Sequence, residues 1–171
     1  MKPPAREPLA KATASAIHLE VRDHYASSDP DYLEWRNGNR EFTRENRDTW
    51  WEGWHEAVQS AVSRGVKVRR ARVVSEPLSE YVQWEYAYTL TNCLAGEEVR
   101  WLPRRETKNL AVPAVDFWVF DSSLVLFHHF SGDGVLMERE YTEDPELAKW
   151  CTASFEAVWE RATPHEGYSP V

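Results

Sequence analysis

Cysteine is scarce in this sequence, with two residues among 171. Cys93 and Cys151 lie far apart and fit neither a CxxC pair nor another metal-ligand spacing, so both are expected to be buried thiols. The six histidines include no HExxH pair, and His128 and His129 would point to opposite faces of a strand. No metal site is predicted, and the chain is long enough to bury a core without disulfide or metal staples.

Long apolar runs are also missing. No segment approaches the roughly 18 apolar residues that a membrane span requires. The polar, proline-bearing segment MKPPAREP at the start of the chain has no apolar region after it, so no signal peptide is expected. The cytoplasm is the expected compartment, without membrane contact.

Three common motifs of nucleotide and hydrolase chemistry are absent from the sequence, namely GxGxxG, GxxxxGK(S/T) and GxSxG. These motifs supply the phosphate-binding loops and the nucleophile elbow of many enzymes. We therefore predict no cofactor and no catalytic residue.

Acidic residues outnumber basic ones, 28 against 20, which gives a net charge of −8. The charge is uneven, because nine Lys and Arg stand against six Asp and Glu between Arg64 and Lys108. Either the basic middle forms internal salt bridges with the acidic flanks, or it presents an anion-binding or docking face. The net charge and the lack of a helix-turn-helix or zinc module disfavour direct nucleic-acid binding.

Hydrophobic residues make up 42% of the chain and aromatic residues 13%, with nine Trp. This composition is typical of a packed globule in which most aromatic side chains are core. We predict a disordered leader over residues 1–12 and one globular α/β domain over 13–171. Apolar spacing predicts helices over 14–25, 30–35 and 48–64, the last ending at Gly65.

A strand, a helix and a second strand are predicted over 66–74, 78–94 and 97–102, which most simply make a right-handed parallel crossover. Three further strands are expected to form a meander, over 115–120, 124–130 and 135–141. An apolar stripe predicts a last helix from Asp144 to Pro164 that packs on the sheet. The expected class is α/β, bordering on α+β, with N-terminal helices and a single mixed sheet of about five strands.

Two carboxylates, Glu85 and Asp116, lie inside apolar segments where a charge needs a partner. Glu76, Glu80 and Asp121 instead fit a helix cap, a solvated helix face and a turn. Arginines on or beside the parallel strands are the obvious partners, so the candidate ligand-binding residues are Arg69, Arg72, Glu85, Arg100, Arg104, Asp116 and Trp118. They form either a buried lattice that holds the sheet to its crossover helix, or an Arg/Trp surface that clamps an anion or stacks a base.

Four segments together resemble an uncharacterised actinobacterial domain family. They are RRARVVSEPLSEYVQW from Arg69, NCLAGEEVRWLPR from Asn92, DFWVFD from Asp116, and FEAVWE near the end of the chain. The resemblance covers about Leu19 to Pro170. It implies a domain of unknown function encoded beside helix-turn-helix regulator genes, and hence a companion of a DNA-binding protein.

The segment RGVKV over 64–68, followed by a later strand ending in Asp121, is similar to one half of the phospholipase D-like fold. The late strand of that fold bears the pattern H-x-K-x4-D. With Asp121 at the Asp position, Ala114 and Asp116 fall at the His and Lys positions. Neither supplies the imidazole nucleophile or the cation, so the resemblance implies that the fold was kept and the hydrolase lost.

The leading hypothesis is a non-enzymatic accessory or regulatory domain that binds a protein partner, such as a helix-turn-helix regulator, or a small ligand, with small anions among the candidates. The alternative is an enzyme or ligand sensor with a pocket of the Arg, carboxylate and Trp side chains named above. Direct nucleic-acid binding is the third hypothesis.

Overall fold

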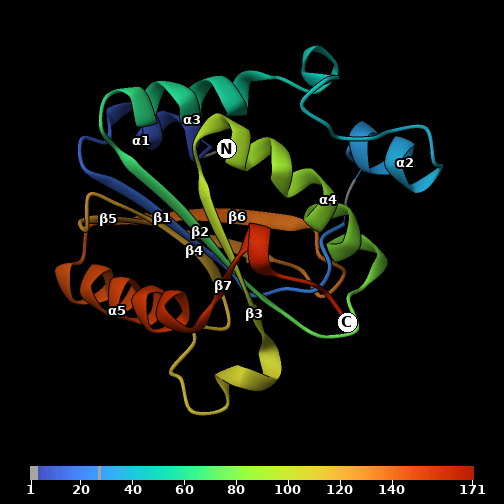
Figure 1. Cartoon of the computed structure of the whole chain (residues 1–171). Helices are drawn as coiled ribbons and strands as arrows, with labels where there is room; N and C mark the ends of the chain where they lie inside the picture. Colours follow the sequence, from blue (N-terminus) through green and yellow to red (C-terminus); the bar gives the residue numbers. More distant parts are fainter. Residues whose placement is uncertain (1–3, 27) are drawn as a thin grey trace.

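One mixed sheet organises the structure, a computed structural model that describes residues 4–26 and 28–171. Among these residues, seven strands lie in the order β6-β5-β4-β1-β2-β3-β7 (Figure 1). Strands β1, β2 and β3 are parallel to one another, and the other neighbours are antiparallel. The strands are β1 Ser15–Glu20, β2 Lys67–Val74, β3 Glu98–Pro103, β4 Asp116–Phe120, β5 Leu124–Phe130, β6 Leu136–Thr142 and β7 Thr163–Pro164.

Helices cover both faces of this sheet. They are α1 Arg6–Lys11, α2 Pro30–Arg36, α3 Gly53–Ser63, α4 Glu80–Ala95 and α5 Pro145–Arg161, with short 3-10 turns at Arg47–Thr49, Arg104–Thr107 and His165–Gly167. Figure 1 shows α1, α3 and α4 over one face and α5 against the other. None of the helices in the described part of the chain is long and apolar enough to cross a membrane.

The predicted parallel crossover is confirmed as β2-α4-β3. Ser79 caps α4 by accepting a hydrogen bond from the backbone N–H of Val82. The helix ends at Gly96, whose φ of 105° lies in the left-handed region. The meander β4-β5-β6 and the packing of α5 on the sheet are confirmed as well.

The helix predicted over 14–25 is wrong, because Ser15–Glu20 forms the central strand β1. Five of its six residues are buried, since helices cover both faces, so the strand lacks the polar alternation of a half-exposed strand. Apolar residues four apart then imitate a helix. This strand and the two-residue β7 raise the count from the expected five to seven.

The segment expected to be a disordered leader is corrected in its described part. Arg6–Lys11 forms the helix α1, and Leu9 within it is fully buried against the sheet side of α3. Arg64 fixes the segment further by donating to the carbonyl oxygens of Leu9, Ala10 and Ala12. Residues 1–3 lie outside the described residues.

The alternation of side chains along the central strands creates two cores. Ile17 and Leu19 of β1 pack with Phe117 and with Phe155 of α5 on one face. On the other face, the apolar cluster under α1 and α3 includes Ala16, Val58 and Trp118. Further along this second face the inward residues of β1 and β2 turn polar, and the candidate site begins there.

Candidate functional site

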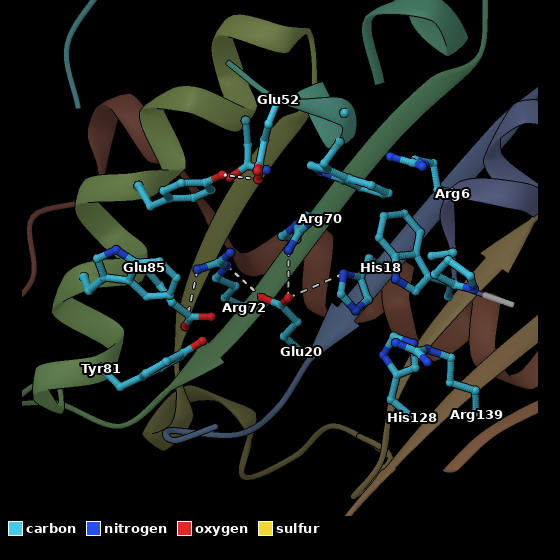
Figure 2. Close-up of a pocket in the computed structure, with 18 residues that line it drawn as sticks. Arg6, His18, Glu20, Glu52, Arg70, Arg72, Tyr81, Glu85, His128 and Arg139 are labelled. Carbon is cyan, nitrogen blue, oxygen red and sulfur yellow. Dashed lines mark hydrogen bonds and ion pairs between the residues drawn. The ribbon is translucent and has the colours of Figure 1, made fainter. Parts of the chain in front are cut away.

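A cavity of about 570 Å³ lies on the face of the sheet that carries α1, α3 and α4 (Figure 2). Strands β1, β2, β4, β5 and β6 supply its floor. Residues from α1, from the start of α3 and from α4 supply its wall and rim. The lining residues are Pro4, Ala5, Arg6, His18, Glu20, Glu52, Gly53, Trp54, Arg70, Arg72, Tyr81, Trp84, Glu85, Tyr88, Asn92, Trp118, His128 and Arg139.

Two arginines of β2 form the centre of the floor. Arg70 donates from NH1 to Glu20 at 2.8 Å and from Nε to Glu97 at 2.7 Å. Arg72 Nε lies 2.7 Å from Glu20 Oε2 without being directed at it, and Arg72 NH1 lies 3.3 Å from Glu85. Parallel pairing of β1 with β2 brings these residues together, because Glu20 stands opposite Arg72.

Glu85 approaches this lattice from α4, with 7% of its surface exposed. Burial raises the pKa of Glu85 to about 8, against the lowering effect of Arg72. The carboxyl group is therefore held largely neutral near pH 7 and can donate a hydrogen bond. Glu20 and Glu97 carry the negative charge that balances Arg70 and Arg72.

A pair of histidines lies beside the arginines. His18 of β1 stacks on Trp118 with ring centroids 4.2 Å apart, and its edge meets His128 of β5 at 6.1 Å. Burial lowers the pKa of His18 well below its usual value, and the charge of Arg70 adds to this effect. Burial also lowers the pKa of His128 to about 4, helped by Arg139 of β6. Both imidazoles are neutral at physiological pH.

Aromatic side chains form much of the wall. Tyr81, Trp84 and Tyr88 follow one another on α4 and contact each other at centroid distances of 5.2 and 5.4 Å. Trp54 of α3 meets Trp118 edge to face at 5.5 Å. Aromatic surfaces thus lie beside a charged floor, and small-molecule sites likewise combine apolar walls with placed polar groups.

Unpaired polar atoms concentrate in this cavity. Among the described residues, twelve buried side-chain nitrogen or oxygen atoms have no hydrogen-bond partner, and nine of them belong to residues that line it. They are His18 Nδ1 and Nε2, Glu20 Oε2, Arg72 Nε and NH1, Trp84 Nε1, Asn92 Oδ1, His128 Nε2 and Arg139 Nε. Because buried polar atoms in folded proteins are nearly always paired, the cavity has unused hydrogen-bonding capacity.

Three of the sequence-predicted site residues, Arg72, Glu85 and Trp118, line this cavity. Arg69 and Arg100 do not, which corrects the expectation of one shared pocket. Arg69 pairs with Glu156 of α5, and Arg100 donates to the carbonyl oxygen of Trp159. Alternation along a strand explains the split, because Arg69 and Arg72 point to opposite faces of the sheet.

The last two predicted residues, Arg104 and Asp116, form hydrogen bonds that connect the ends of neighbouring strands. Arg104 donates to the carbonyl oxygens of Val21 and Val73 at 2.8 and 3.1 Å, which ties β1 to β2. Asp116 accepts hydrogen bonds from the backbone N–H of Val21 and from the hydroxyl of Tyr25. Burial raises the pKa of Asp116 to about 6.

Sequence reasoning missed His18, Glu20, Arg70, His128 and Arg139. His18 and Glu20 were missed because residues 14–25 were predicted to be a helix. On a helix these two side chains would not point to the same face, whereas on the strand β1 they do. Arg70 shares its face of β2 with Arg72, so the alternation of β2 alone could have added it. His128 and Arg139 required the β5-β6 register.

Within the described residues, no three His, Cys, Asp or Glu side chains gather as metal ligands. The sequence comparison assigns Ala114 and Asp116 to the His and Lys positions of the phospholipase D-like pattern, and this assignment stays a prediction. Asp121, at the Asp position, accepts from the backbone N–H groups of Thr13, Ala14 and Ser15.

Solved structures similar to this chain support a phospholipase D-like fold. Nuc from Salmonella typhimurium, a phospholipase D family member, is 12% identical with a TM-score of 0.52, over 93% of this chain and 86% of Nuc. NucT from Helicobacter pylori is 13% identical with a TM-score of 0.49, over 93% of this chain and 87% of NucT. At these identities the likeness concerns the fold alone.

A third similar structure is TrmBL2, described as an archaeal chromatin protein with a novel mode of DNA binding. It is 15% identical with a TM-score of 0.49, and the match covers 92% of this chain and 47% of TrmBL2, so the chain spans about half of that protein. The prediction that direct nucleic-acid binding is disfavoured is withdrawn, since a DNA-binding protein is among the matches. No curated protein matches the chain.

The family is shown by a match along almost the whole chain. Residues 5–170 fit the model described as Domain of unknown function (DUF6879). This agrees with the resemblance to an uncharacterised family found in the sequence. The chain therefore belongs to the DUF6879 family of domains of unknown function.

Proposed function

We propose that this domain binds a small polar molecule in the cavity between the sheet and helices α1, α3 and α4. The observation that carries the proposal is the concentration of unpaired buried polar atoms there, nine of the twelve among the described residues. Four of the nine lie within ion-pair distance of an oppositely charged or ionisable partner, namely Glu20 Oε2, Arg72 Nε, Arg72 Nη1 and His18 Nδ1. The other five have no such partner, and each unpaired buried polar atom destabilises a protein by about 1–3 kcal/mol. A ligand that supplies donors and acceptors would pair with several of these atoms at once.

The size and rigidity of the cavity favour the same conclusion. A volume of about 570 Å³ lies within the roughly 300–1,000 Å³ range of small-molecule sites. Arg70 and Arg72 are held by Glu20, Glu85 and Glu97, so they need little rearrangement to meet a ligand. Affinity rises when the binding groups are fixed in advance.

The aromatic wall indicates a ligand with a flat unsaturated part. Trp84 and Trp118 are nearly fully buried, whereas Trp54 and Tyr88 are partly exposed near the rim. Such side chains stack on planar groups and on guanidinium or ammonium groups. The cavity favours the small-ligand part of our sequence-based hypothesis over the protein-partner part.

Acid-base catalysis is a second candidate, supported by one observation. Burial raises the pKa of Glu85 to about 8 and that of Asp116 to about 6, and perturbed carboxyl groups cluster at active sites. Burial alone explains both shifts, so ligand binding without chemistry is the function we propose.

A ligand screen with a matched pair of variants tests the proposal. His128 and His129 are neighbours on β5, but His128 lines the cavity while His129 pairs with Glu140 on the other side of the strand. His128→Trp would fill the cavity, and His129→Trp would add the same bulk outside it. Compounds that raise the melting temperature of the wild type should also stabilise His129→Trp but not His128→Trp.

Circular dichroism of both variants would establish that they remain folded. The proposal is wrong if compounds stabilise His128→Trp as much as the wild type, because the binding site would then lie elsewhere. It is equally wrong if a broad screen of planar polar compounds yields no stabilising compound for the wild type.

A further inference from the structure

Positive charge is unevenly balanced along the cavity. Arg70 and Arg72 are paired with the carboxylates of Glu20 and Glu97, and Arg72 Nη1 also lies 3.3 Å from the carboxyl group of Glu85. Across the described residues, by contrast, neither Arg6 nor Arg139 has a carboxylate within ion-pair distance. Figure 2 shows both at the end of the cavity that holds His18 and His128, away from Tyr81 and Glu85. We call these four residues, Arg6, His18, His128 and Arg139, the cationic end.

The strand geometry separates Arg139 from the nearest acids. Arg139 stands directly opposite His128 in the β5-β6 pair, so both point into the cavity. Glu138 and Glu140 flank Arg139 in sequence but project from the other face of β6. Glu140 binds His129 there at 2.8 Å. The sheet thus places a half-buried guanidinium among neutral rings.

Arg6 reaches the same end from α1. Its NH1 atom lies only 2.4 Å from the position that a Cβ atom on Gly53 would occupy, so a glycine at the start of α3 makes room for it. Glu52 also lines the cavity, but its carboxylate accepts from the backbone of the first turn of α3 and from the hydroxyl of Tyr88. Glu7, also on α1, lines a different cavity beside Tyr141.

Unpaired nitrogen atoms gather at the cationic end. Arg139 Nε, His128 Nε2 and both ring nitrogens of His18 are buried without a hydrogen bond. His18 is 6% exposed, so no bulk water reaches it freely. A guanidinium and neutral imidazoles together offer several donors toward one region. Among the described residues, the carboxylate within ion-pair distance of these groups is that of Glu20, whose Oε1 lies 3.5 Å from His18 Nδ1.

We propose that the cationic end binds the anionic group, a carboxylate or a phosphate, of the small molecule that occupies the cavity. This inference rests on the proposed function and specifies the ligand. Arginine suits the task because its fork of N–H groups matches carboxylate and phosphate oxygens, and each charge-assisted hydrogen bond is stronger than a neutral one. Burial is the main cause of the lowered pKa values of His18 and His128, and the neighbouring arginine charges lower them further.

Three small probes test this assignment. Benzoate and phenyl phosphate each carry a ring and an anion, and benzamide is the neutral counterpart of benzoate. Calorimetric titration would give their affinities, and the NMR signal of the Arg139 Nε–H group would show where they bind. The anions should bind the wild type more tightly than benzamide and shift this signal, and the tighter of the two would distinguish a carboxylate from a phosphate ligand.

Arg139→Gln should weaken the tighter anion at least about tenfold, equivalent to about 1.4 kcal/mol, while leaving benzamide unchanged. Arg6→Gln, on the exposed face of α1, provides a second variant that does not disturb the sheet. Arg44→Gln is the control, because Arg44 is exposed and does not line the cavity. It should leave every affinity as in the wild type.

The outcomes separate the two proposals. If benzamide and benzoate bind equally well, and Arg139→Gln binds both as the wild type does, the cavity binds ligands but the anion assignment is wrong. If neither anion binds the wild type at millimolar concentration, the assignment is again overturned. The cavity itself is then judged by the His128→Trp and His129→Trp pair.

Discussion

The carboxylate of Asp121 accepts a hydrogen bond from the backbone N–H of Ala14 at 2.8 Å. The neighbouring N–H groups of Thr13 and Ser15 donate to the same carboxylate at 2.9 Å each. These bonds hold the start of β1 to the end of β4. Asp121 therefore has a structural role in this chain.

Asp121→Ala should destabilise the protein by about 2 kcal/mol, because three backbone donors lose a charged acceptor. Urea unfolding followed by fluorescence would measure the change. Asp133→Ala is the matched control, since Asp133 is an exposed turn residue, and its free energy of unfolding should stay within about 0.5 kcal/mol of the wild type. Equal stabilities of the two variants would contradict the structural role.

The contribution of Asp121 should also depend on pH. Burial raises its pKa, but the three backbone N–H donors outweigh this effect, so the pKa of Asp121 in the folded protein is below 3.8. A carboxyl group with a lowered pKa stabilises the fold above its unfolded pKa and loses that effect as the pH falls through the folded pKa. The stability difference between wild type and Asp121→Ala should therefore shrink below pH 3.8.

The sequence predicted local units well because their signals are local. Helix α4 shows this, since Ser79 and Gly96 mark its ends and the preceding strand β2 contains three valines. Strand β1 could not be found in the same way. Its environment is set by α5 on one face and by the cavity on the other, and neither contact can be read from residues 15–20 alone.

The candidate site was predicted only in part, for a related reason. Residue type indicated that Arg72, Glu85 and Trp118 needed partners, and all three line the cavity. Side chains alternate between the two faces of a strand, so the position of each arginine decides its face. Arg69 and Arg100 lie on the face covered by α5. His128 and Arg139 lie opposite each other because of the register in which β5 pairs with β6, and the sequence alone does not give this register.

Two adjacent arginines of β2 point to opposite faces of the sheet, and their contributions to stability can be compared. Arg70 is 8% exposed and its guanidinium binds Glu20 and Glu97, whereas the adjacent Arg69 binds a partly exposed Glu156 on the opposite face. Arg70→Met should destabilise the protein by about 3–5 kcal/mol, because two buried carboxylates lose their partner. Arg69→Met should cost at most about 1 kcal/mol, as for other solvent-accessible pairs.

Thermal and urea unfolding of the two variants would measure this difference. Both substitutions remove one positive charge and keep a long side chain, so the comparison isolates the face of the sheet. A larger loss for Arg69→Met than for Arg70→Met would show that the buried lattice is not the stabilising element of this strand.

The pKa of His128 gives the last prediction. Burial is the main cause of its lowering to about 4, and the charge of Arg139 is the next. Arg139→Gln should therefore raise the pKa of His128 without returning it to 6.5, because burial remains. NMR titration of the imidazole signals would follow the change, with Arg44→Gln as a control of the same charge change. A pKa of His128 that stays unchanged or falls in Arg139→Gln would mean that the guanidinium does not face the imidazole, and the cationic end would lose its central pair.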